Sequence, residues 1–443
     1  MAVAAGIKHS LVVSEQGHLF TFGNGGNGEL GLGDNTETHT PVRVAGLPPV
    51  RQVAAGHRHT GIVTEAGELL MAGAGWDGQL GLGEKLQMTT PTLVTRSLFG
   101  GEAVLMVACG WAHTVVATKG GSVYTFGNGI FGRLGHGDAN EQLSPQRVPA
   151  AGFNGERIVM VAAVGLHTVA LSEKGHVFTW GGGGHGQLGH DRKWRELAPR
   201  QVEPGWFGST QDDVPERVVY VAAGGHHTAA VTAGGQLYTW GENGAGQLGH
   251  GDLDDRLVPT VVEGFGASKG GEVVMVACGA KHTLVVTRNG ALWACGRGVF
   301  GELGLNDEAD RNVFERVTGD KNAAFGGEMV VAVAAGSTHS QAVTKDGALW
   351  TWGDGDKGRL GHGTNQKLLL PTRVTIPPLE HTRVGRLLPL APEHALAFGL
   401  SLHQREIPPE IIKMMIETIS STCGLDRVRH RAVITLIGGF WMI

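Results

Sequence analysis

The stretch Val221–Gly251, VAAGGHHTAAVTAGGQLYTWGENGAGQLGHG, decides the fold because close copies of it recur along the whole chain. Each copy starts at V-A-x-G or a near variant and runs through a histidine, a glycine turn, a third strand and G-x-L-G. The seven aligned histidines are His9, His59, His113, His167, His227, His282 and His339. Copies spaced about 55 residues apart, with strand-like patterning inside each, indicate a repeat architecture.

Each repeat has the pattern of four short antiparallel strands. In the fifth copy we expect strands at Val218–Ala222, Thr228–Thr232, Gln236–Gly241 and Pro259–Val262. The first is apolar and β-branched. The glycine turn before Gln236 suits a tight hairpin, and the proline in the fourth strand suits a sheet edge. Seven such units predict an all-β fold, a seven-bladed β-propeller of four-stranded antiparallel blades.

An aromatic residue precedes the glycine that ends the third strand in five copies, and Ala72 and Cys295 replace it in the other two. A blade that is covered on both faces by its neighbours needs large apolar side chains at that position. We therefore expect packing between blades from Phe22, Phe126, Trp180, Trp240 and Trp352.

Two repeated motifs look like functional sites. The histidines are related by the ring axis and should lie far apart, so we expect each to bond backbone groups left unpaired by its loop. The segment G-x-G-x-x-G, as in Gly353–Gly358, matches a dinucleotide-binding fingerprint but lacks the helix that would hold the pyrophosphate. We expect no catalytic residue, no cofactor and no metal.

The pattern V-A-x-G-x-x-H-T…G-x-L-Y-T-W-G…G-x-L-G-x-G…P-x-x-V resembles the regulator of chromosome condensation repeats. Repeats of this family build a Ran exchange factor, the plant ultraviolet-B photoreceptor and domains of giant HECT ubiquitin ligases. The resemblance covers residues 1–400 and implies a seven-bladed propeller. It leaves the function open, because one fold can host exchange factors, light sensors and scaffolds.

Composition narrows the class of protein further. The net charge is −5 and no basic arm is present, which disfavours binding to nucleic acid through phosphate neutralisation. The cysteines form no C-x-x-C pair, so we expect reduced thiols of an intracellular, cytoplasmic or nuclear protein. These cysteines are Cys109, Cys278, Cys295 and Cys423. We also expect a monomer without a signal peptide or a membrane span.

Function should lie where the copies differ, and the two residues before each histidine differ most. Equivalent loops of a propeller share a face, so these residues should form one surface that has basic side chains and no carboxylate. Such a surface would dock an acidic protein partner, unless it is an ordinary solvated loop. The predicted partner-binding face is Lys8, His57, Arg58, Trp111, His226, Lys281 and Thr338.

The family resemblance gives two other functions for the same loops. Acidic side chains feature at these positions in the Ran exchange factor, whereas here only His226 keeps a family-type histidine. The photoreceptor carries Trp-Arg pairs there, whereas here Trp111 precedes Ala112. The leading interpretation is therefore a non-catalytic protein-interaction scaffold. The alternative is guanine-nucleotide exchange on a small GTPase, and an ultraviolet-B sensor is favoured less.

Two segments depart from the repeat. A loop rich in Gly and Pro between the fourth and fifth copies is a candidate protruding anchor or folds back on its own blade, and its residues are Trp206, Phe207, Asp212 and Asp213. After the seventh copy, Val384–Phe398 resembles half a repeat, which we expect to help close the ring. Residues 401–443 form a separate tail, in which Glu410–Ile419 has the pattern of an amphipathic helix.

Overall fold

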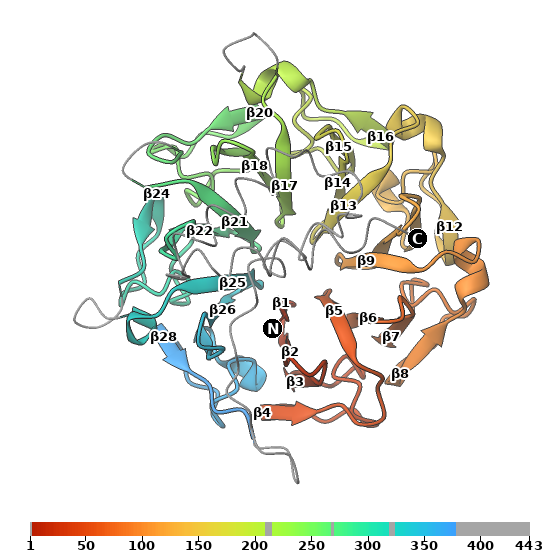
Figure 1. Cartoon of the computed structure of the whole chain (residues 1–443), viewed down its shortest axis with the longest axis horizontal. Coiled ribbons are helices and arrows are strands. Elements are labelled where there is room, and N and C mark those ends of the chain that lie inside the picture. The colour runs from red at the N-terminus through yellow and green to blue at the C-terminus, as the bar shows by residue number, and fades with distance from the viewer. Residues whose placement is uncertain (1, 209–214, 267–269, 319–323, 378–443) are drawn as a thin grey trace, which may run out of the picture. The chain divides into compact units, whose positions relative to one another are not determined.

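The computed structural model describes residues 2–208, 215–266, 270–318 and 324–377, which form seven four-stranded antiparallel sheets arranged in a ring (Figure 1). Each sheet comes from one continuous segment whose strands pair in chain order. The predicted seven-bladed propeller is confirmed. The expected helix at Glu410–Ile419 and the half-repeat Val384–Phe398 lie outside the described residues.

The strands of a blade run in order from the centre of the ring to its rim. Blade 1 consists of β1 (Ala2–Ala5), β2 (His9–Val13), β3 (Leu19–Gly23) and β4 (Thr38–Arg43), and blade 2 of β5 (Val50–Ala55), β6 (His59–Thr64), β7 (Leu69–Gly73) and β8 (Met88–Val94). Blade 3 consists of β9 (Val104–Cys109), β10 (His113–Thr118), β11 (Val123–Gly127) and β12 (Gln142–Arg147). Blade 4 consists of β13 (Ile158–Ala163), β14 (His167–Ser172), β15 (Val177–Gly181) and β16 (Glu196–Gln201).

Blades 5 to 7 repeat this arrangement. They consist of β17 (Val218–Ala223), β18 (His227–Thr232), β19 (Leu237–Gly241) and β20 (Arg256–Val261), then β21 (Val273–Cys278), β22 (His282–Thr287), β23 (Leu292–Gly296) and β24 (Arg311–Arg316), then β25 (Val330–Ala335), β26 (His339–Thr344), β27 (Leu349–Gly353) and β28 (Leu368–Arg373). Short 3-10 turns occur at η1 (Arg96–Phe99), η2 (Ile130–Gly132), η3 (Ala150–Phe153), η4 (Pro204–Phe207), η6 (Ala324–Gly327) and η7 (Asp356–Gly358).

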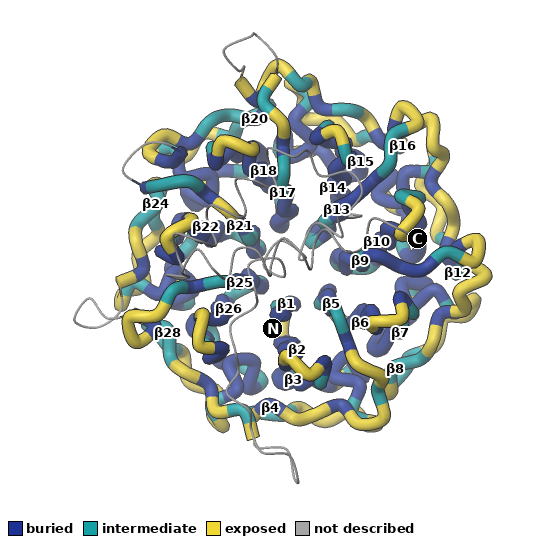
Figure 2. Tube along the Cα trace, in the orientation of Figure 1, coloured by how far each residue is buried: buried dark blue, intermediate teal, exposed yellow. Residues whose placement is uncertain are grey.

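The second and third strands of each blade carry most of the buried core, whereas exposed residues gather in the loops and along the rim (Figure 2). The aromatic side chains at the end of the third strand are fully buried, as predicted. They pack against the preceding blade, because Trp240 Nε1 donates to the backbone oxygen of Gln187 at 2.9 Å. Each blade is thereby wedged against its neighbour.

The repeated histidines link neighbouring blades. His227 Nε2 of blade 5 lies 2.9 Å from Thr283 Oγ1 of blade 6, and that hydroxyl donates back to the backbone oxygen of Gln247 in blade 5 at 2.7 Å. All seven histidines make this contact, at 2.9–3.2 Å. The prediction that each histidine bonds backbone groups of its own loop is wrong, because its partner is a side chain of the next blade.

This geometry fixes the protonation of the histidine ring. Because the hydroxyl uses its proton for the carbonyl, the histidine must donate from Nε2, and a neutral ring then leaves Nδ1 without a proton. Nδ1 has no hydrogen-bond partner in any of the seven histidines within the described part of the chain. Burial lowers the pKa of His227 to about 3. The ring is therefore neutral, because burial and the unpartnered Nδ1 both disfavour its protonated form.

The same link closes the ring. Ser10 Oγ of blade 1 lies 3.0 Å from His339 Nε2 of blade 7 and donates to the backbone oxygen of Arg359 at 2.7 Å. Blade 1 has its four strands within residues 2–43.

Glycine lines the inner mouth of the ring because neighbouring backbones approach closely there. A Cβ on Gly279 would lie 2.3 Å from Cε1 of His282 and 2.5 Å from the backbone oxygen of Gly336. Blade 4 has Val164 at this position, and the next residue, Gly165, takes over the contact by accepting from Trp111 N at 3.4 Å. Backbone bonds of this kind join the variable pairs of neighbouring blades.

Candidate functional site

The loops between the first and second strands and between the third and fourth strands of every blade lie on one face, because strand direction alternates in an antiparallel sheet. We call it the loop face. The two loops of each blade are joined by a backbone bond, such as that from Asn24 N to the oxygen of Lys8 at 2.8 Å. The variable pairs before the seven histidines all lie here.

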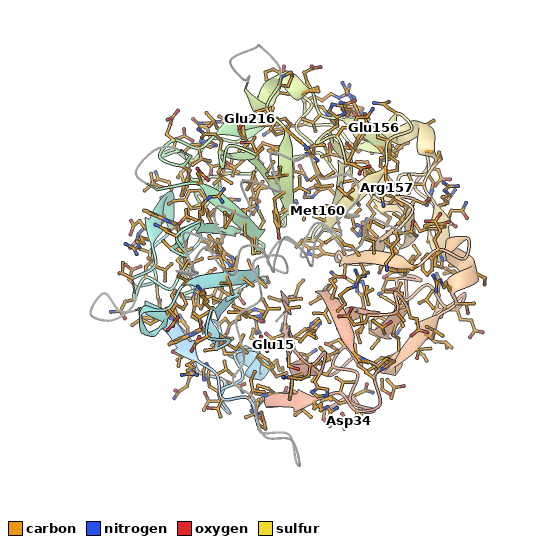
Figure 3. The ribbon with its side chains drawn as sticks, in the orientation of Figure 1. Glu15, Asp34, Glu156, Arg157, Met160 and Glu216 are labelled. Carbon is orange, nitrogen blue, oxygen red and sulfur yellow. The ribbon has the colours of Figure 1, made fainter. Side chains whose placement is uncertain are left out.

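The opposite face carries the hairpins and the connectors between blades, and we call it the connector face. Figure 3 labels Glu156, Arg157 and Glu216 on these connectors. Glu156 lies 2.9 Å from His176 Nδ1, and Arg157 lies 3.6 Å from Glu173. The charges of Glu156 and Arg157 are therefore locally paired.

The loop face is not basic, which corrects the expectation of a surface without carboxylates. Lys8 Nζ lies 3.6 Å from Asp356, and Lys281 Nζ lies 3.0 Å from Glu242. Thr338 Oγ1 donates to Asp354 at 3.1 Å. These carboxylates come from the loops between the third and fourth strands, which the sequence analysis did not place on this face.

The remaining predicted residues form aromatic contacts. The guanidinium of Arg58 lies over the ring of Trp76, 5.7 Å from its centre. Trp111 meets His226 edge-on with ring centres 5.9 Å apart, across blade 4, where the intervening pair begins with Gly165. Burial, together with Arg58 and Lys8, lowers the pKa of His57. The predicted face thus divides into ion pairs on one side and aromatic groups on the other.

Three exposed apolar side chains extend the aromatic side, and the sequence analysis missed them. Trp76 is 46% exposed, Ile130 51% and Phe131 41%. Their loops touch, because Asn128 Nδ2 donates to Asp77 at 2.9 Å and Ile130 N donates to Asn128 Oδ1 at 2.9 Å. We call the set Arg58, Trp76, Trp111, Ile130 and Phe131 the aromatic patch.

The candidate protruding loop lies on the connector face and divides into two parts. Phe207 does not protrude: it is buried and packs edge-on against Tyr238, with ring centres 5.4 Å apart. Trp206 is 41% exposed, and Asp212 and Asp213 lie outside the described residues. Phe207 is one of five connector phenylalanines that wedge into the next blade, the others being Phe99, Phe153, Phe265 and Phe325.

Trp194 is another residue that sequence reasoning missed. It is 68% exposed at the rim of blade 4, between Lys193 and Arg195. Lys193 Nζ lies 2.7 Å from Asp255 of blade 5. Other blades have small or polar side chains or a leucine at this position, so a comparison of the copies at each loop position would have singled out this tryptophan.

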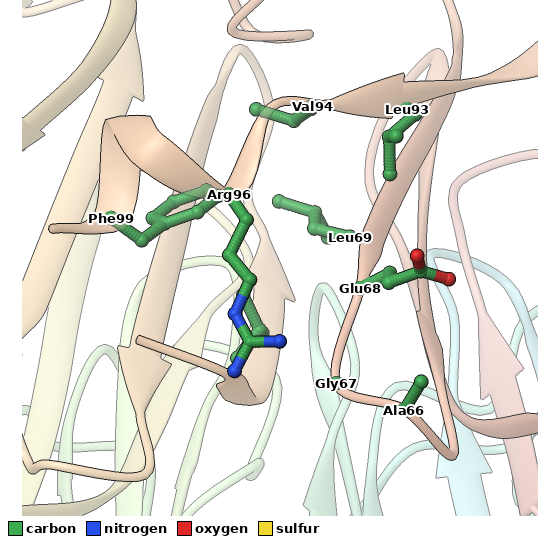
Figure 4. A pocket seen from close by; sticks show the side chains of 9 residues that line it. Ala66, Gly67, Glu68, Leu69, Leu93, Val94, Arg96 and Phe99 are labelled. Carbon is green, nitrogen blue, oxygen red and sulfur yellow. The ribbon is translucent and has the colours of Figure 1, made fainter. Parts of the chain in front are cut away.

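One small cavity lies on the connector face. It has a volume of about 100 Å³ and is lined by Leu69, Val94, Phe99 and Val104, with Glu68 and Arg96 on its two sides (Figure 4). The part of the chain that the structure describes contains no cluster of three or more His, Cys, Asp or Glu placed to bind a metal. Cys109, Cys278 and Cys295 are buried free thiols.

Among the described residues, no helix has the length and apolarity that a bilayer crossing requires. Their G-x-G-x-x-G segments follow the third strand and lead to the fourth strand of the blade.

Comparison with known proteins agrees with the repeats. The RCC1-like domain profile matches residues 98–388, and the regulator of chromosome condensation (RCC1) repeat profile matches residues 16–63 and 66–117. Over 272 residues the chain is 39% identical to the ultraviolet-B receptor UVR8 of Arabidopsis thaliana, and over 285 residues 38% identical to the human E3 ubiquitin-protein ligase HERC2. The matched segments cover 61% and 64% of this chain.

The chain spans only 58% of the length of UVR8 and 5% of HERC2. Among solved structures, Prp20p of Saccharomyces cerevisiae superposes with a TM-score of 0.70 at 27% identity, covering 83% of this chain and 88% of that one. The seven repeats, the closed ring and these matches lead to one conclusion: the chain belongs to the regulator of chromosome condensation (RCC1) repeat family.

Proposed function

We propose that the chain is a non-catalytic docking platform whose partner protein binds the aromatic patch of the loop face. The observation that carries the proposal is the joint exposure of Trp76, Ile130 and Phe131 on two touching loops. Exposed apolar clusters commonly mark interaction sites, and tryptophan and arginine dominate binding energy at interfaces. Other blades have Gly26, Gly184 and Gly244 at the first of these loop positions, so the patch is not a demand of the repeat.

The backbone of Phe131 supports the same conclusion. Its φ of 65° lies in the left-handed region, which costs about 1 kcal/mol or more for a residue with a side chain. Phe131 nevertheless leaves 41% of its surface exposed to solvent, so folding buries only part of its ring. A partner that covers the ring would offset this cost.

Affinity capture on the immobilised full chain tests the proposal. Trp76→Ser with Phe131→Ser is expected to weaken capture of the specific partner at least about tenfold, because such anchors contribute about 2 kcal/mol each. Trp206→Ser is the matched control, since it removes an equally exposed ring from the connector face. Equal loss of the partner in both variants, or in neither, would contradict the proposal.

A second candidate is nucleotide exchange on a small GTPase. It is favoured by the likeness to Prp20p, whose structure was reported together with its binding to Gsp1p and histones. Exchange requires remodelling of the GTPase and no bond chemistry in the propeller. Release of a fluorescent nucleotide from Ran-, Rab- and Arf-like GTPases would test it, and an unchanged rate across the panel would remove it.

A further inference from the structure

We infer that the partner places an aspartate or glutamate carboxylate against Arg133, at the inner border of the aromatic patch. The inference rests on the docking function proposed above and names the chemistry of the docking group. It comes from comparing two loops of this chain that share one backbone and differ in side chains.

Arg133 of blade 3 and Arg359 of blade 7 occupy equivalent positions in their loops. Both follow a 3-10 turn with a left-handed residue, Phe131 with φ 65° or Lys357 with φ 63°. The arginines themselves have φ and ψ of −59° and −15°, and of −60° and −12°. Each donates from Nε to a carbonyl three residues earlier, at 2.9 Å for Ile130 and 2.7 Å for Asp356.

Side chains of its own blade surround the guanidinium of Arg359. Nη1 lies 3.1 Å from Asp354 and 2.7 Å from Thr338 Oγ1. Nη2 lies 3.0 Å from the carboxylate of Asp356. Two carboxylates therefore neutralise this buried cation, and a hydroxyl accepts a further hydrogen bond from it, as buried charges require.

Blade 3 replaces all three of these groups. Asn128, Ile130 and Ala112 stand where blade 7 has Asp354, Asp356 and Thr338. The Asn128 amide is already used, because its Nδ2 donates to Asp77 and its Oδ1 accepts from Ile130 N. Among the described residues, the only hydrogen bond of the Arg133 side chain is that from Nε to the Ile130 oxygen, and none of them forms an ion pair with it.

Arg133 is nevertheless only 4% exposed. Burial lowers its pKa to about 10, and the charge of Asp77 opposes this shift without approaching to ion-pair distance. A guanidinium that is this little exposed and has no carboxylate partner is less well compensated than that of Arg359. A partner that brings a carboxylate to the position of the missing Asp356 would make the charge-assisted, two-pronged contact that arginine favours.

The chain can test this without a partner, because Ile130→Asp rebuilds the carboxylate of blade 7. Compared with the neutral control Ile130→Asn, Ile130→Asp is expected to raise the melting temperature by about 2 °C or more at low salt. The difference should vanish when Arg133 is also changed to glutamine, which isolates the pair in a double-mutant cycle. An aspartate variant no more stable than the asparagine variant would show that Arg133 needs no carboxylate.

Selection of random twelve-residue peptides displayed on phage, with the full chain as bait, tests binding directly. Peptides that depend on Trp76 and Phe131 are expected to carry an acidic residue beside apolar ones. Arg133→Gln should weaken them about tenfold or more, whereas Arg96→Gln on the connector face should not. Patch-dependent peptides without acidic enrichment would overturn this inference and leave the docking function standing. Selected peptides that ignore the patch would overturn both.

Discussion

Replacing Trp240 with alanine is expected to lower the free energy of unfolding by about 4 kcal/mol. The ring is fully buried between blades 4 and 5, and loss of a core aromatic leaves a cavity that costs about 3–5 kcal/mol. The backbone oxygen of Gln187 also loses the indole donor that now lies 2.9 Å away, while Thr228 Oγ1 still donates to it at 2.7 Å. Urea unfolding followed by circular dichroism would measure the change.

Trp206→Ala is the control for this substitution. Trp206 lies in the neighbouring connector with 41% of its surface exposed, so its removal should cost less than about 1 kcal/mol. Similar losses for the two variants would mean that the rings at the ends of the third strands do not hold the blades together.

Acid is expected to unfold the propeller cooperatively between about pH 6 and pH 4. The seven linking histidines are buried and neutral, and burial lowers the pKa of His9, His59, His167, His227 and His282 to about 3. Burial also places the pKa of His113 and His339 well below the ordinary value. In the unfolded chain the same side chains would titrate near their ordinary pKa of about 6.5.

The direction in which pH changes the stability follows from the lowered pKa of the histidines. The contribution of these histidines to stability is complete above about pH 6.5 and is lost as the pH falls toward about 3, because only the unfolded chain takes up the protons. As the pH falls through this window, each histidine lowers the free energy of unfolding by about 1.4 kcal/mol per pH unit. Seven acting together would exceed a typical stability of about 5–15 kcal/mol within roughly two pH units.

Tryptophan fluorescence against pH would locate the transition, and potentiometric titration across it should detect uptake of close to seven protons by the histidines. His282→Gln should reduce that uptake by about one. A propeller that stays folded below pH 3, or one whose transition takes up no histidine protons, would refute the neutral link.

Most of the fold could be predicted from the sequence because each blade repeats the same physical demands. A glycine recurs at the position of Gly279 in most blades, where a Cβ would collide with the imidazole of the histidine three residues later. An aromatic residue recurs at the position of Trp240 in most blades, where two blades meet. The strand boundaries moved by a few residues, as in β20, which begins at Arg256 instead of Pro259. The pairing of β20 with β19 continues on the N-terminal side of the proline as far as Arg256, because it resumes after a bulge.

The site was less predictable because its contacts join residues from different loops. The sequence singled out Arg58 and Trp111, but nothing near Lys8 in the chain reveals Asp356, which comes from the last blade. Trp76 lies in the G-x-G-x-x-G segment Gly73–Gly78, and Ile130 and Phe131 lie in the copy Gly127–Gly132. From the sequence this motif was considered only for nucleotide binding. The differences among its copies were the available signal, since a glycine in several blades becomes tryptophan or isoleucine in two others.

Hydrogen exchange of the full chain, alone and with its captured partner, tests most directly whether the aromatic patch is where the chain binds. The account predicts slowed exchange in residues 75–79 and 128–133, with little change in the hairpins and connectors of the opposite face. Protection confined to the connector face, or to the loops of blades 5 to 7, would contradict it.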